Sequence, residues 1–343
     1  MNNFILELKK LNLGKIEKDI SLSTLTTYKT GGIAKLVVYP NNINGLKQLL
    51  KLINKYNIKC FILGKGSNTL FSDKEFNGVI IKLDKLNNFE IKENEIYVES
   101  GMILSKLVQE SIKNNLTGLE FAAGIPGTIG GAIYMNAGAY GSNMSNIVKS
   151  VIVLDEKLQI EEIPLEKLKF DYRYSIFQIN KKLICIAANI KLDYGNHDEI
   201  DCKIKDNLLK RKNSQPLEYP SAGSVFRNPK GNYAGKIIEE LGLKGKNIGG
   251  AEISTKHANF IINKNNASSS DILNLIKLLN NYYPTLLYIY VTMYGFCILN
   301  EEPEPEFPVL ELVVFCPDTV IDVLDIGVDT QTLEAAPSPA ICI

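Results

Sequence analysis

Residues that bind metal ions or form disulfides are few and scattered in this sequence. The 343 residues include six cysteines, no two of them in a CxxC pair, and only two histidines, His197 and His257. This spacing provides neither a disulfide framework nor a zinc site. We therefore expect reduced thiols and a cytoplasmic protein.

A basic excess and a long apolar segment are also missing. The formal net charge is zero, whereas nucleic-acid-binding proteins usually carry a basic excess that neutralises phosphates. The N-terminus mixes charged with apolar residues and lacks a signal-peptide core. The longest apolar run, residues 285–299, is shorter than the roughly 20 residues of a membrane-spanning helix. We expect a soluble protein that binds neither nucleic acid nor membranes.

Lysine and arginine do not occur after Lys277. All 38 basic residues lie at or before this position, but 10 of the 38 acidic residues lie after it, so 38 basic residues face 28 acidic ones in the body. The body thus carries +10 and the tail −10, and so abrupt a shift indicates a boundary. The tail segment EEPEPEFP, from Glu301, cannot be helical and favours an extended linker.

Small residues are most concentrated in residues 118–141, GLEFAAGIPGTIGGAIYMNAGAYG. Glycine allows positive φ and lets the main chain lie directly against a bulky group. Pro126-Gly127 predicts a turn, and Thr128 predicts the N-cap of a short helix. Free N–H groups at such a helix start suit a phosphate. We expect a dinucleotide cofactor held by backbone contacts; the alternative is a tight crossing of two elements without a ligand.

A second glycine loop, GKGSN at residues 64–68, follows a predicted βαβ unit. The unit consists of a strand at residues 34–39, a helix with its apolar residues at i, i+3, i+4 and i+7, and a strand at residues 58–63. Another strand, not a long helix, follows at residues 79–83, which excludes a Rossmann loop. The loop favours a nest of N–H groups, with Ser67 and Asn68 as further partners of a pyrophosphate; the alternative is a simple turn.

The rest of the chain predicts an α+β fold with a second unit. Residues 148–154 and 183–192 predict antiparallel strands. A basic helix then ends at Pro216, and a further helix is expected at residues 235–241. Residues 251–263 predict a turn into a strand, and Ser268 to Ser270 predict the cap of a last helix.

Seven motifs follow one another along the chain: YKTGGIA (residues 28–34), GKGSN, residues 118–141, YRYSIF (172–177), SAGSVFRNP (221–229), AGKIIEELGLKG (234–245) and HANFIIN (257–263). Together they resemble the UDP-N-acetylenolpyruvoylglucosamine reductase family, which completes UDP-N-acetylmuramate in peptidoglycan synthesis. The resemblance covers most of residues 20–283.

The resemblance implies an α+β FAD-binding fold of the vanillyl-alcohol-oxidase (PCMH) type. Residues 1–195 would bind FAD in two subdomains, roughly 1–84 and 85–195. Residues 196–283 would form a smaller α+β substrate-binding domain, and residues 284–343 are an atypical acidic tail. The resemblance also implies a UDP-sugar substrate and NADPH as reductant, and we expect a monomer. Because neither glycine loop contains His or Cys, we expect the FAD to be non-covalent.

Two residues match catalytic positions of the family. Arg173 offers the permanent planar cation that a developing carboxylate charge requires; the alternative is a structural ion pair. Ser224 matches the family's proton donor, although a serine hydroxyl must be positioned to act as an acid; the alternative is a turn residue.

Other positions would contact the cofactor or the substrate. Expected to contact FAD are Tyr28, Thr30, Gly64, Lys65, Gly66, Ser67, Asn68, Ala123, Gly124, Pro126, Gly127, Thr128 and Gly131. Expected to contact the substrate are Tyr172, Arg227, Asn228 and Lys236. Lys210, Arg211 and Lys212 are further candidates, or a solvated helix face. His257 is either a ligand contact or a hydrogen-bonded structural residue, and His197 is expected to be exposed.

The family's closing strand, which carries a catalytic glutamate, is missing from its expected place. Glu311, in VLELVVF, is the best local substitute, because Glu302, Glu304 and Glu306 lie in a proline-rich segment unsuited to a buried strand. This gives the hypothesis that the tail is a non-native ending, produced by a shifted reading frame. Two alternative functions follow: a flavin-binding protein with little or no reductase turnover, and an FAD oxidase of another small substrate. The motifs around Arg173 and Ser224 argue against the second.

Overall fold

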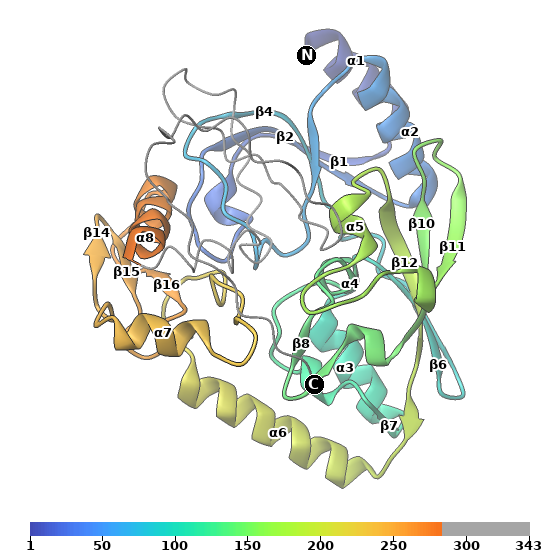
Figure 1. Ribbon diagram of the computed structural model, residues 1–343. Helices are drawn as coiled ribbons and strands as arrows, with labels where there is room; N and C mark the ends of the chain where they lie inside the picture. The colour runs from blue at the N-terminus through green and yellow to red at the C-terminus, as the bar shows by residue number, and fades with distance from the viewer. Residues whose placement is uncertain (283–343) are drawn as a thin grey trace, which may run out of the picture.

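A four-stranded sheet in the order β1-β2-β4-β3 forms the first part of the chain, within residues 1–282, which the computed structural model describes (Figure 1). β1 is antiparallel to β2, whereas β2 and β3 are both parallel to β4. The predicted βαβ unit is confirmed, with β4 inserted between its two strands. The elements are α1 (Asn2–Leu11), β1 (Gly14–Ser21), η1 (Leu22–Thr24), β2 (Ile33–Pro40), α2 (Ile43–Lys55), β3 (Cys60–Ile62) and β4 (Phe76–Ile81).

Helix α2 forms where the apolar spacing predicts it. Asn42 caps the helix, because its Oδ1 accepts a hydrogen bond from the N–H of Gly45 at 2.9 Å. The apolar face, with Leu46 and Leu49 fully buried, packs into one core with α1 and the sheet. Local spacing and a local cap therefore suffice to specify this crossover.

A five-stranded antiparallel sheet in the order β11-β10-β12-β6-β5 forms the second part. The predicted antiparallel strands at residues 148–154 and 183–192 are β10 and β12, and they pair directly. The elements are β5 (Phe89–Lys92), β6 (Glu95–Glu99), α3 (Leu104–Lys113), β7 (Leu116–Thr117), η2 (Glu120–Ala122), α4 (Ile129–Tyr134), β8 (Gly138–Ala139), β9 (Ser142–Asn143), η3 (Met144–Asn146), β10 (Val148–Leu154), β11 (Ile160–Pro164), η4 (Leu165–Lys167), α5 (Ile176–Ile179), β12 (Ile184–Lys191) and β13 (Asp193–Tyr194).

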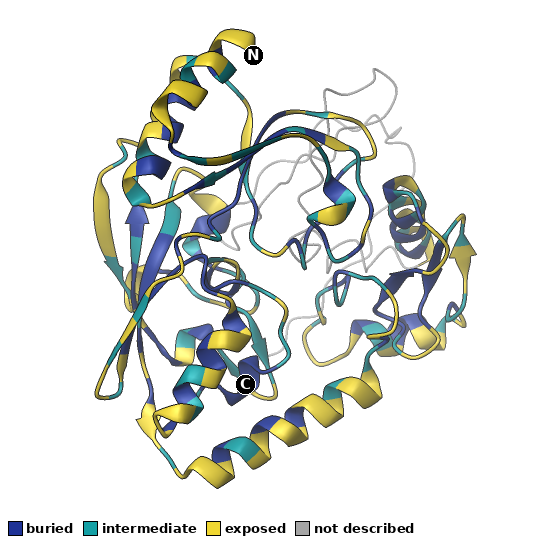
Figure 2. Cartoon of the chain, turned by 180° about the vertical axis from the view of Figure 1, so that it is seen from behind, coloured by how far each residue is buried: buried dark blue, intermediate teal, exposed yellow. Residues whose placement is uncertain are grey.

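A long helix leads from the second part to a third, smaller one. In Figure 1 this helix, α6, runs along the lower edge of the molecule and ends beside α7 and the sheet β14-β15-β16. Figure 2 shows α6 mostly exposed, whereas β15 and β16 are buried. The elements are α6 (His197–Ser214), α7 (Ala234–Glu240), β14 (Asn247–Ile248), β15 (Ala251–Ile253), β16 (Ile261–Asn263) and α8 (Ser269–Tyr282).

The third part is joined to the first by specific polar contacts. Asn263 Nδ2 donates to the carbonyl oxygen of Tyr28 at 2.9 Å, and Tyr28 itself is fully buried in the core of the third part. The carboxylate of Asp73 accepts the N–H groups of Ser269 at 2.9 Å and Ser270 at 3.1 Å. A residue of the first part thus caps α8, in addition to the predicted cap by Ser268, whose Oγ accepts from the N–H of Asp271.

The predicted boundaries at residues 84 and 195 fall in the segments that follow β4 and β13. None of the helices within residues 1–282 is long and apolar enough to cross a membrane. The apolar run at residues 285–299, the proline-rich segment and Glu311 lie outside the described residues.

Candidate active site

The two glycine loops meet. A Cβ on Gly64 would lie 3.0 Å from Oγ1 of Thr128, and the hydroxyl of Ser67 donates to the carbonyl oxygen of Pro126. Thr128 caps α4 as predicted, since its Oγ1 accepts from the N–H of Gly131 at 3.4 Å. Residues 64–68 and 126–131, which the sequence assigns to one cofactor, therefore lie side by side.

The loop at residues 64–68 has the properties of an N–H nest. Within residues 1–282, the four amide N–H groups from Lys65 to Asn68 donate no hydrogen bond. Gly66 has φ +63°, and a Cβ there would lie 2.2 Å from the carbonyl oxygen of Leu25. Only glycine fits this turn, and its neighbours present successive N–H groups suited to an anion.

Tyr28 and Thr30 belong to a segment that lies against this loop in space, although it is distant in sequence. The N–H of Thr27 donates to the carbonyl oxygen of Gly66 at 3.1 Å, which places their segment against the loop. Thr30 is buried, and its Oγ1 has no hydrogen-bond partner within the described residues. A buried hydroxyl without a partner fits a bound polar group.

The glycines of residues 118–141 divide into two kinds. Gly124 and Gly130 are packing positions, because a Cβ on Gly124 would lie 2.9 Å from Leu208 of α6 and one on Gly130 would lie 3.0 Å from Ser100. Gly127 faces open space, with no heavy atom within 4 Å of an added Cβ. One of the two alternatives, a tight crossing of two elements, is thus present at Gly124 and Gly130, and Gly127 leaves room for the expected cofactor contact. The neighbouring Ala123 is buried.

A cavity of about 140 Å³ opens beside these loops. It brings together two lysines, an acid and the helix cap, and it is lined by Lys65, Asp84, Asn87, Gly101, Met102, Ile103, Lys106 and Thr128. The backbone of its wall is fixed by bonds from Leu104 N to Gly127 O at 3.0 Å and from Ile129 N to Met102 O at 2.9 Å. Amide groups and two ammonium groups around one cavity suit a diphosphate. Among the described residues no group of three or more acidic, His or Cys side chains could hold a metal ion.

Glu120 anchors the start of the second loop, a role that sequence reasoning missed. Its carboxylate accepts from the N–H of Gly118 at 2.7 Å and from the hydroxyl of Thr117. Burial by itself raises the pKa of Glu120, but these hydrogen bonds outweigh it and hold the pKa below its usual value. Asn207 of α6 donates to the carbonyl oxygen of Glu120 at 3.0 Å. Glu120 thus fixes the start of the loop through its carboxylate and ties it to α6 through its carbonyl oxygen.

Arg173 lies at the end of the second glycine stretch. Its guanidinium donates to the carbonyl oxygens of Asn136, at 3.4 Å, and Gly138, and it stacks over the ring of Tyr172, with the centroid 5.3 Å away. The backbone of Arg173 is in the left-handed region, with φ +57°, a conformation that costs a non-glycine residue of order 1–3 kcal/mol. Surrounding contacts must therefore hold this turn.

Two side chains hold the turn through the main-chain carbonyl oxygen of Arg173. Gln178 Nε2 donates to this oxygen at 2.9 Å, and Arg227 Nη2 donates to it at 2.7 Å. Arg227 is three residues beyond Ser224, so a side chain from the segment that carries Ser224 reaches the turn that carries Arg173.

Asn259 fixes the Ser224 segment. The carbonyl oxygen and Oδ1 of Asn259 accept from the N–H groups of Val225 and Phe226, both at 2.8 Å, and its Nδ2 donates to the carbonyl oxygen of Phe226, also at 2.8 Å. Ser224 itself forms a β-bridge with Phe260. The motif HANF thus holds the segment that carries Ser224, a role that the sequence alone did not reveal.

His257 is a structural residue within this arrangement. Its Nδ1 accepts from the N–H of Asn259 at 3.2 Å, and its ring centroid lies 4.8 Å from that of Phe260. Burial lowers the pKa of His257 below its ordinary value of 6.5. Of the two interpretations of this histidine, a ligand contact or a hydrogen-bonded structural residue, these contacts support the second. His197 is exposed, as predicted.

The predicted substrate contacts lie on several surfaces. Tyr172 is half-exposed beneath Arg173. Oδ1 of Asn228 accepts from the N–H of Ala234 at 3.1 Å, at the start of α7, and exposed Lys236 lies 3.8 Å from Glu240. Asn228 thus has a local structural role, whereas Lys236 extends from α7 into solvent.

The basic cluster of α6 serves in part as structure. Lys210 pairs with Asp206 at 2.6 Å, and Arg211 packs beneath Gly124. The carbonyl oxygen of Lys212 cannot receive the usual helical bond from residue 216, which is Pro216 and has no N–H.

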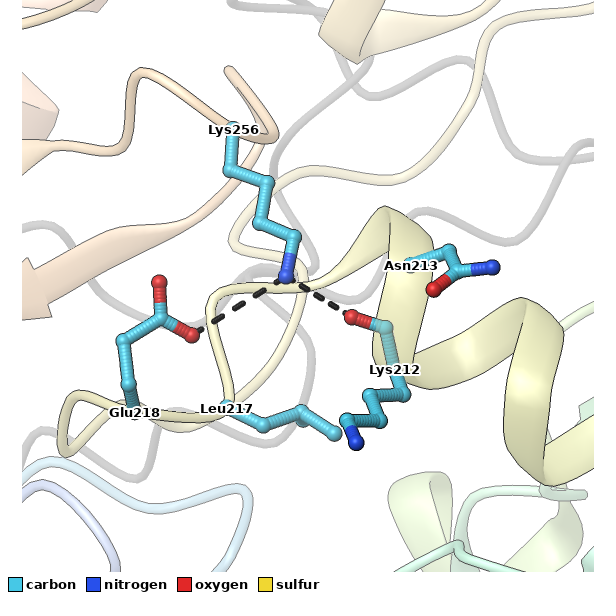
Figure 3. A pocket seen from close by; sticks show the side chains of 5 residues that line it. All are labelled: Lys212, Asn213, Leu217, Glu218 and Lys256. Carbon is cyan, nitrogen blue, oxygen red and sulfur yellow. Dashed lines mark hydrogen bonds and ion pairs between the residues drawn. The ribbon is translucent and has the colours of Figure 1, made fainter.

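Lys256 supplies the missing donor at 2.7 Å. It crosses an open cavity of about 810 Å³ between the end of α6 and the third part, and Figure 3 shows its ammonium group between the carbonyl oxygen of Lys212 and the carboxylate of Glu218. Lys256, a residue of the third part, thus caps the C-terminal end of α6 across this cavity.

Comparison with known proteins supports the sequence and the fold together. A model of the UDP-N-acetylenolpyruvoylglucosamine reductase C-terminal domain matches residues 215–281, and a model of an FAD binding domain matches residues 34–162. The UDP-N-acetylenolpyruvoylglucosamine reductase of Anoxybacillus flavithermus is 47% identical over 271 residues, which is 79% of this chain and 90% of that protein. That of Caldanaerobacter subterraneus is 46% identical over 267 residues, 78% of this chain and 88% of that protein.

A solved structure gives the same picture. The crystal structure of UDP-N-acetylenolpyruvylglucosamine reductase from Thermus caldophilus superposes with a TM-score of 0.70 at 32% identity. It covers 79% of this chain and 96% of its own.

Proposed function

The chain belongs to the UDP-N-acetylenolpyruvoylglucosamine reductase family, and from this membership we infer that it reduces UDP-N-acetylglucosamine enolpyruvate to UDP-N-acetylmuramate in peptidoglycan precursor synthesis. It is an FAD enzyme, in keeping with the FAD binding domain over residues 34–162. We propose NADPH as the reductant and non-covalent attachment of the flavin. The match to 90% of a reductase from Anoxybacillus flavithermus supports the assignment of the reductase activity.

The residues present fit the diphosphate of FAD. The four amides from Lys65 to Asn68, which donate no hydrogen bond within residues 1–282, would hold it, opposite the segment that carries Thr128. The hydroxyl of Thr30, buried and without a partner within the described residues, would accept or donate a further hydrogen bond. When bound, the flavin supplies hydride chemistry, and the remaining tasks fall to side chains of this chain.

Arg173 is the proposed electrostatic catalyst. Reduction of the enolpyruvyl double bond places negative charge on the substrate carboxylate, and a fixed guanidinium stabilises that charge. The carbonyl oxygens of Asn136 and Gly138 hold the guanidinium of Arg173 in place, and its planar group of N–H donors matches the geometry of a carboxylate. The stacking on Tyr172 orients the plane of the group.

Ser224 is the proposed proton donor to the α-carbon. The clamp by Asn259 fixes the main chain on its C-terminal side, so that the position of the hydroxyl is set by the backbone. The observation that best supports the pair is the hydrogen bond from Arg227, three residues after Ser224, to the main-chain carbonyl oxygen of Arg173. The UDP moiety would then meet Tyr172, Arg227, Asn228 and Lys236.

A glutamate completes the proposed catalytic set. Glu311 is the candidate, and it lies outside the described residues. The variant Glu311→Gln is expected to lower turnover, whereas the combined Glu302, Glu304 and Glu306→Gln variant is expected to retain it. Equal turnover of both variants would remove Glu311 from the proposal, and a comparison of residues 278–343 with the coding DNA in three frames would test the shifted-frame hypothesis.

Steady-state kinetics of the full chain test the function. We expect a yellow protein that oxidises NADPH only when UDP-N-acetylglucosamine enolpyruvate is added. A yellow protein without this dependence would instead support the flavin-binding protein that lacks turnover. We further propose that the enzyme acts as a monomer in the cytoplasm; the described cysteines Cys60, Cys185 and Cys202 are all free thiols.

A further inference from the structure

Lys82 is a buried charge that the proposed chemistry does not use. It follows β4 directly, is only 5% exposed, and lysine is almost never buried to this degree without a specific partner. Its Nζ donates to the carbonyl oxygen of Gly64 and lies 3.5 Å from Oδ1 of Asp84. The ammonium therefore sits directly against the first residue of the cofactor loop.

The parallel pairing of β3 with β4 explains this contact. Ile62 pairs with Ile81, and the N–H of Leu63 donates to the carbonyl oxygen of Ile81 at 2.9 Å. The main-chain N–H of Lys82, one residue beyond this pair, donates to the carbonyl oxygen of Val38 at 2.9 Å. The main chain of Lys82 is thus held by the sheet, and its side chain reaches the neighbouring strand end at Gly64.

The contact with a carbonyl oxygen determines where an N–H points. A trans peptide is planar, and its C=O and N–H groups point in opposite directions. Because Lys82 holds the carbonyl oxygen of Gly64, the N–H of Lys65 points away from Lys82. Thr27 acts in the same way two peptides further on, since its N–H holds the carbonyl oxygen of Gly66 and so directs the N–H of Ser67.

We propose that Lys82 is a positioning residue for the cofactor diphosphate. It holds the carbonyl oxygen of Gly64 and thereby orients the N–H groups of the nest at residues 64–68. Lys82 does not itself touch the diphosphate. Its charge adds to the field of the two lysines that line the adjoining cavity, Lys65 and Lys106, while Asp84 balances it before the cofactor enters. The proposal rests on the proposed function in one respect, namely that FAD binds to this loop.

Burial of Lys82 agrees with this role. Desolvation lowers its pKa, while the carboxylate of Asp84 opposes that change. A neutral methionine has nearly the same length and would remain buried without this penalty. The lysine is therefore costly for the fold, and a role in holding the loop accounts for its presence.

The affinities of the full chain for FAD and for riboflavin, which lacks the diphosphate, test the proposal. Purified protein is stripped of flavin and titrated with each ligand while flavin fluorescence is measured. In Lys82→Met we expect the dissociation constant for FAD to rise about 10-fold or more, in line with the loss of a hydrogen bond to a charged group. The constant for riboflavin should stay within about 2-fold, because riboflavin has no group that the nest would bind.

Two variants act as controls. Lys85→Met removes a charge from an exposed lysine three residues away and should leave both constants unchanged. Lys82→Gln retains a neutral donor and should lose only part of the preference for FAD. Partial unfolding cannot imitate the expected result, because both ligands bind the same folded fraction and the ratio of their constants is unaffected.

An unchanged ratio in Lys82→Met, or an equal loss of FAD and riboflavin, would overturn the role of Lys82. Failure of the wild-type chain to prefer FAD over riboflavin would instead contradict the cofactor assignment itself. The two failures are therefore distinguishable in one set of titrations.

Discussion

Arg227 reaches from the third part of the chain and donates a hydrogen bond from Nη2 to the main-chain carbonyl oxygen of Arg173 at 2.7 Å. The two residues are 54 positions apart, and the contact supports a backbone with φ +57°. The position of one proposed catalytic group therefore depends on the segment that carries the other, Ser224.

Replacement of Arg227 should impair turnover through Arg173. Arg227→Met removes a charged hydrogen bond of about 1.5–3 kcal/mol, so we expect kcat/KM to fall about 10- to 100-fold, while the FAD dissociation constant stays unchanged. Steady-state kinetics and flavin titration measure the two effects. The exposed neighbour Lys230 provides the control Lys230→Met, and a loss of similar size in both variants would point to general charge effects.

Arg173 should be needed for its shape as well as its charge. Arg173→Lys keeps a cation but cannot bind a carboxylate with two parallel donors, so we expect kcat to fall about 100-fold or more. In Arg173→Met we expect kcat to fall further. Flavin content, read from the visible absorption spectrum, should match that of the wild type in both. A lysine variant with wild-type kcat would show that a point charge is sufficient.

Ser224 should act on the substrate and not on flavin reduction. Ser224→Ala is expected to lower kcat by about 100-fold or more, the usual contribution of a proton donor. Bleaching of the flavin by NADPH alone, followed by stopped-flow absorbance, should keep its wild-type rate. Ser221→Ala, in the same motif, is the control. Slower bleaching in Ser224→Ala would assign the serine to the cofactor instead.

Asp73 should hold the third part to the first. Its carboxylate caps α8 through the N–H groups of Ser269 and Ser270, so Asp73→Ala is expected to cost about 1 kcal/mol of stability. Hydrogen exchange at these two amides should speed up, whereas exchange in α2 should not change. If exchange at Ser269 and Ser270 kept its wild-type rate, another group would have to cap the helix.

His257 should make the protein sensitive to mild acid. Burial depresses its folded-state pKa below 6.5, so the unfolded chain binds more protons as the pH falls below about 6.5 and the free energy of unfolding decreases. Above that pH both states are neutral and the effect vanishes. Urea unfolding at pH 7.5 and 5.5 should show a smaller decrease in His257→Gln than in the wild type. The exposed His197 provides the control, and His197→Gln should behave as the wild type.

Local signals in the sequence predicted the elements that depend on neighbouring residues. The apolar spacing of Leu46, Leu49, Leu50 and Ile53 predicted α2, and Thr128 predicted the start of α4, because both depend on contacts within a few residues. The prediction of an anion nest at residues 64–68 rests on the same kind of local signal, since a nest consists of consecutive N–H groups.

Contacts between distant segments were not predictable from local signals. The cap of α8 comes from Asp73, 196 residues before Ser269, and the clamp on the Ser224 segment comes from Asn259, 33 residues beyond Phe226. The sequence does not distinguish Gly124 from Gly127, although Gly124 packs on α6 and Gly127 faces open space. Such pairings exist only when the chain has folded, because side chains far apart in sequence have no fixed relation before that.

By itself the sequence determined the family, the α+β fold and the kinds of chemical group at the site. Residue identity decides which side chains can carry charge or donate protons, and where glycine leaves the backbone free to adopt a positive φ. Tertiary structure alone decided which of those groups are supported. Sheet register set Lys82 under Gly64, and packing of the third part set Arg227 against Arg173. The physical reason is that a side chain acquires a defined direction only from the neighbours that folding brings to it.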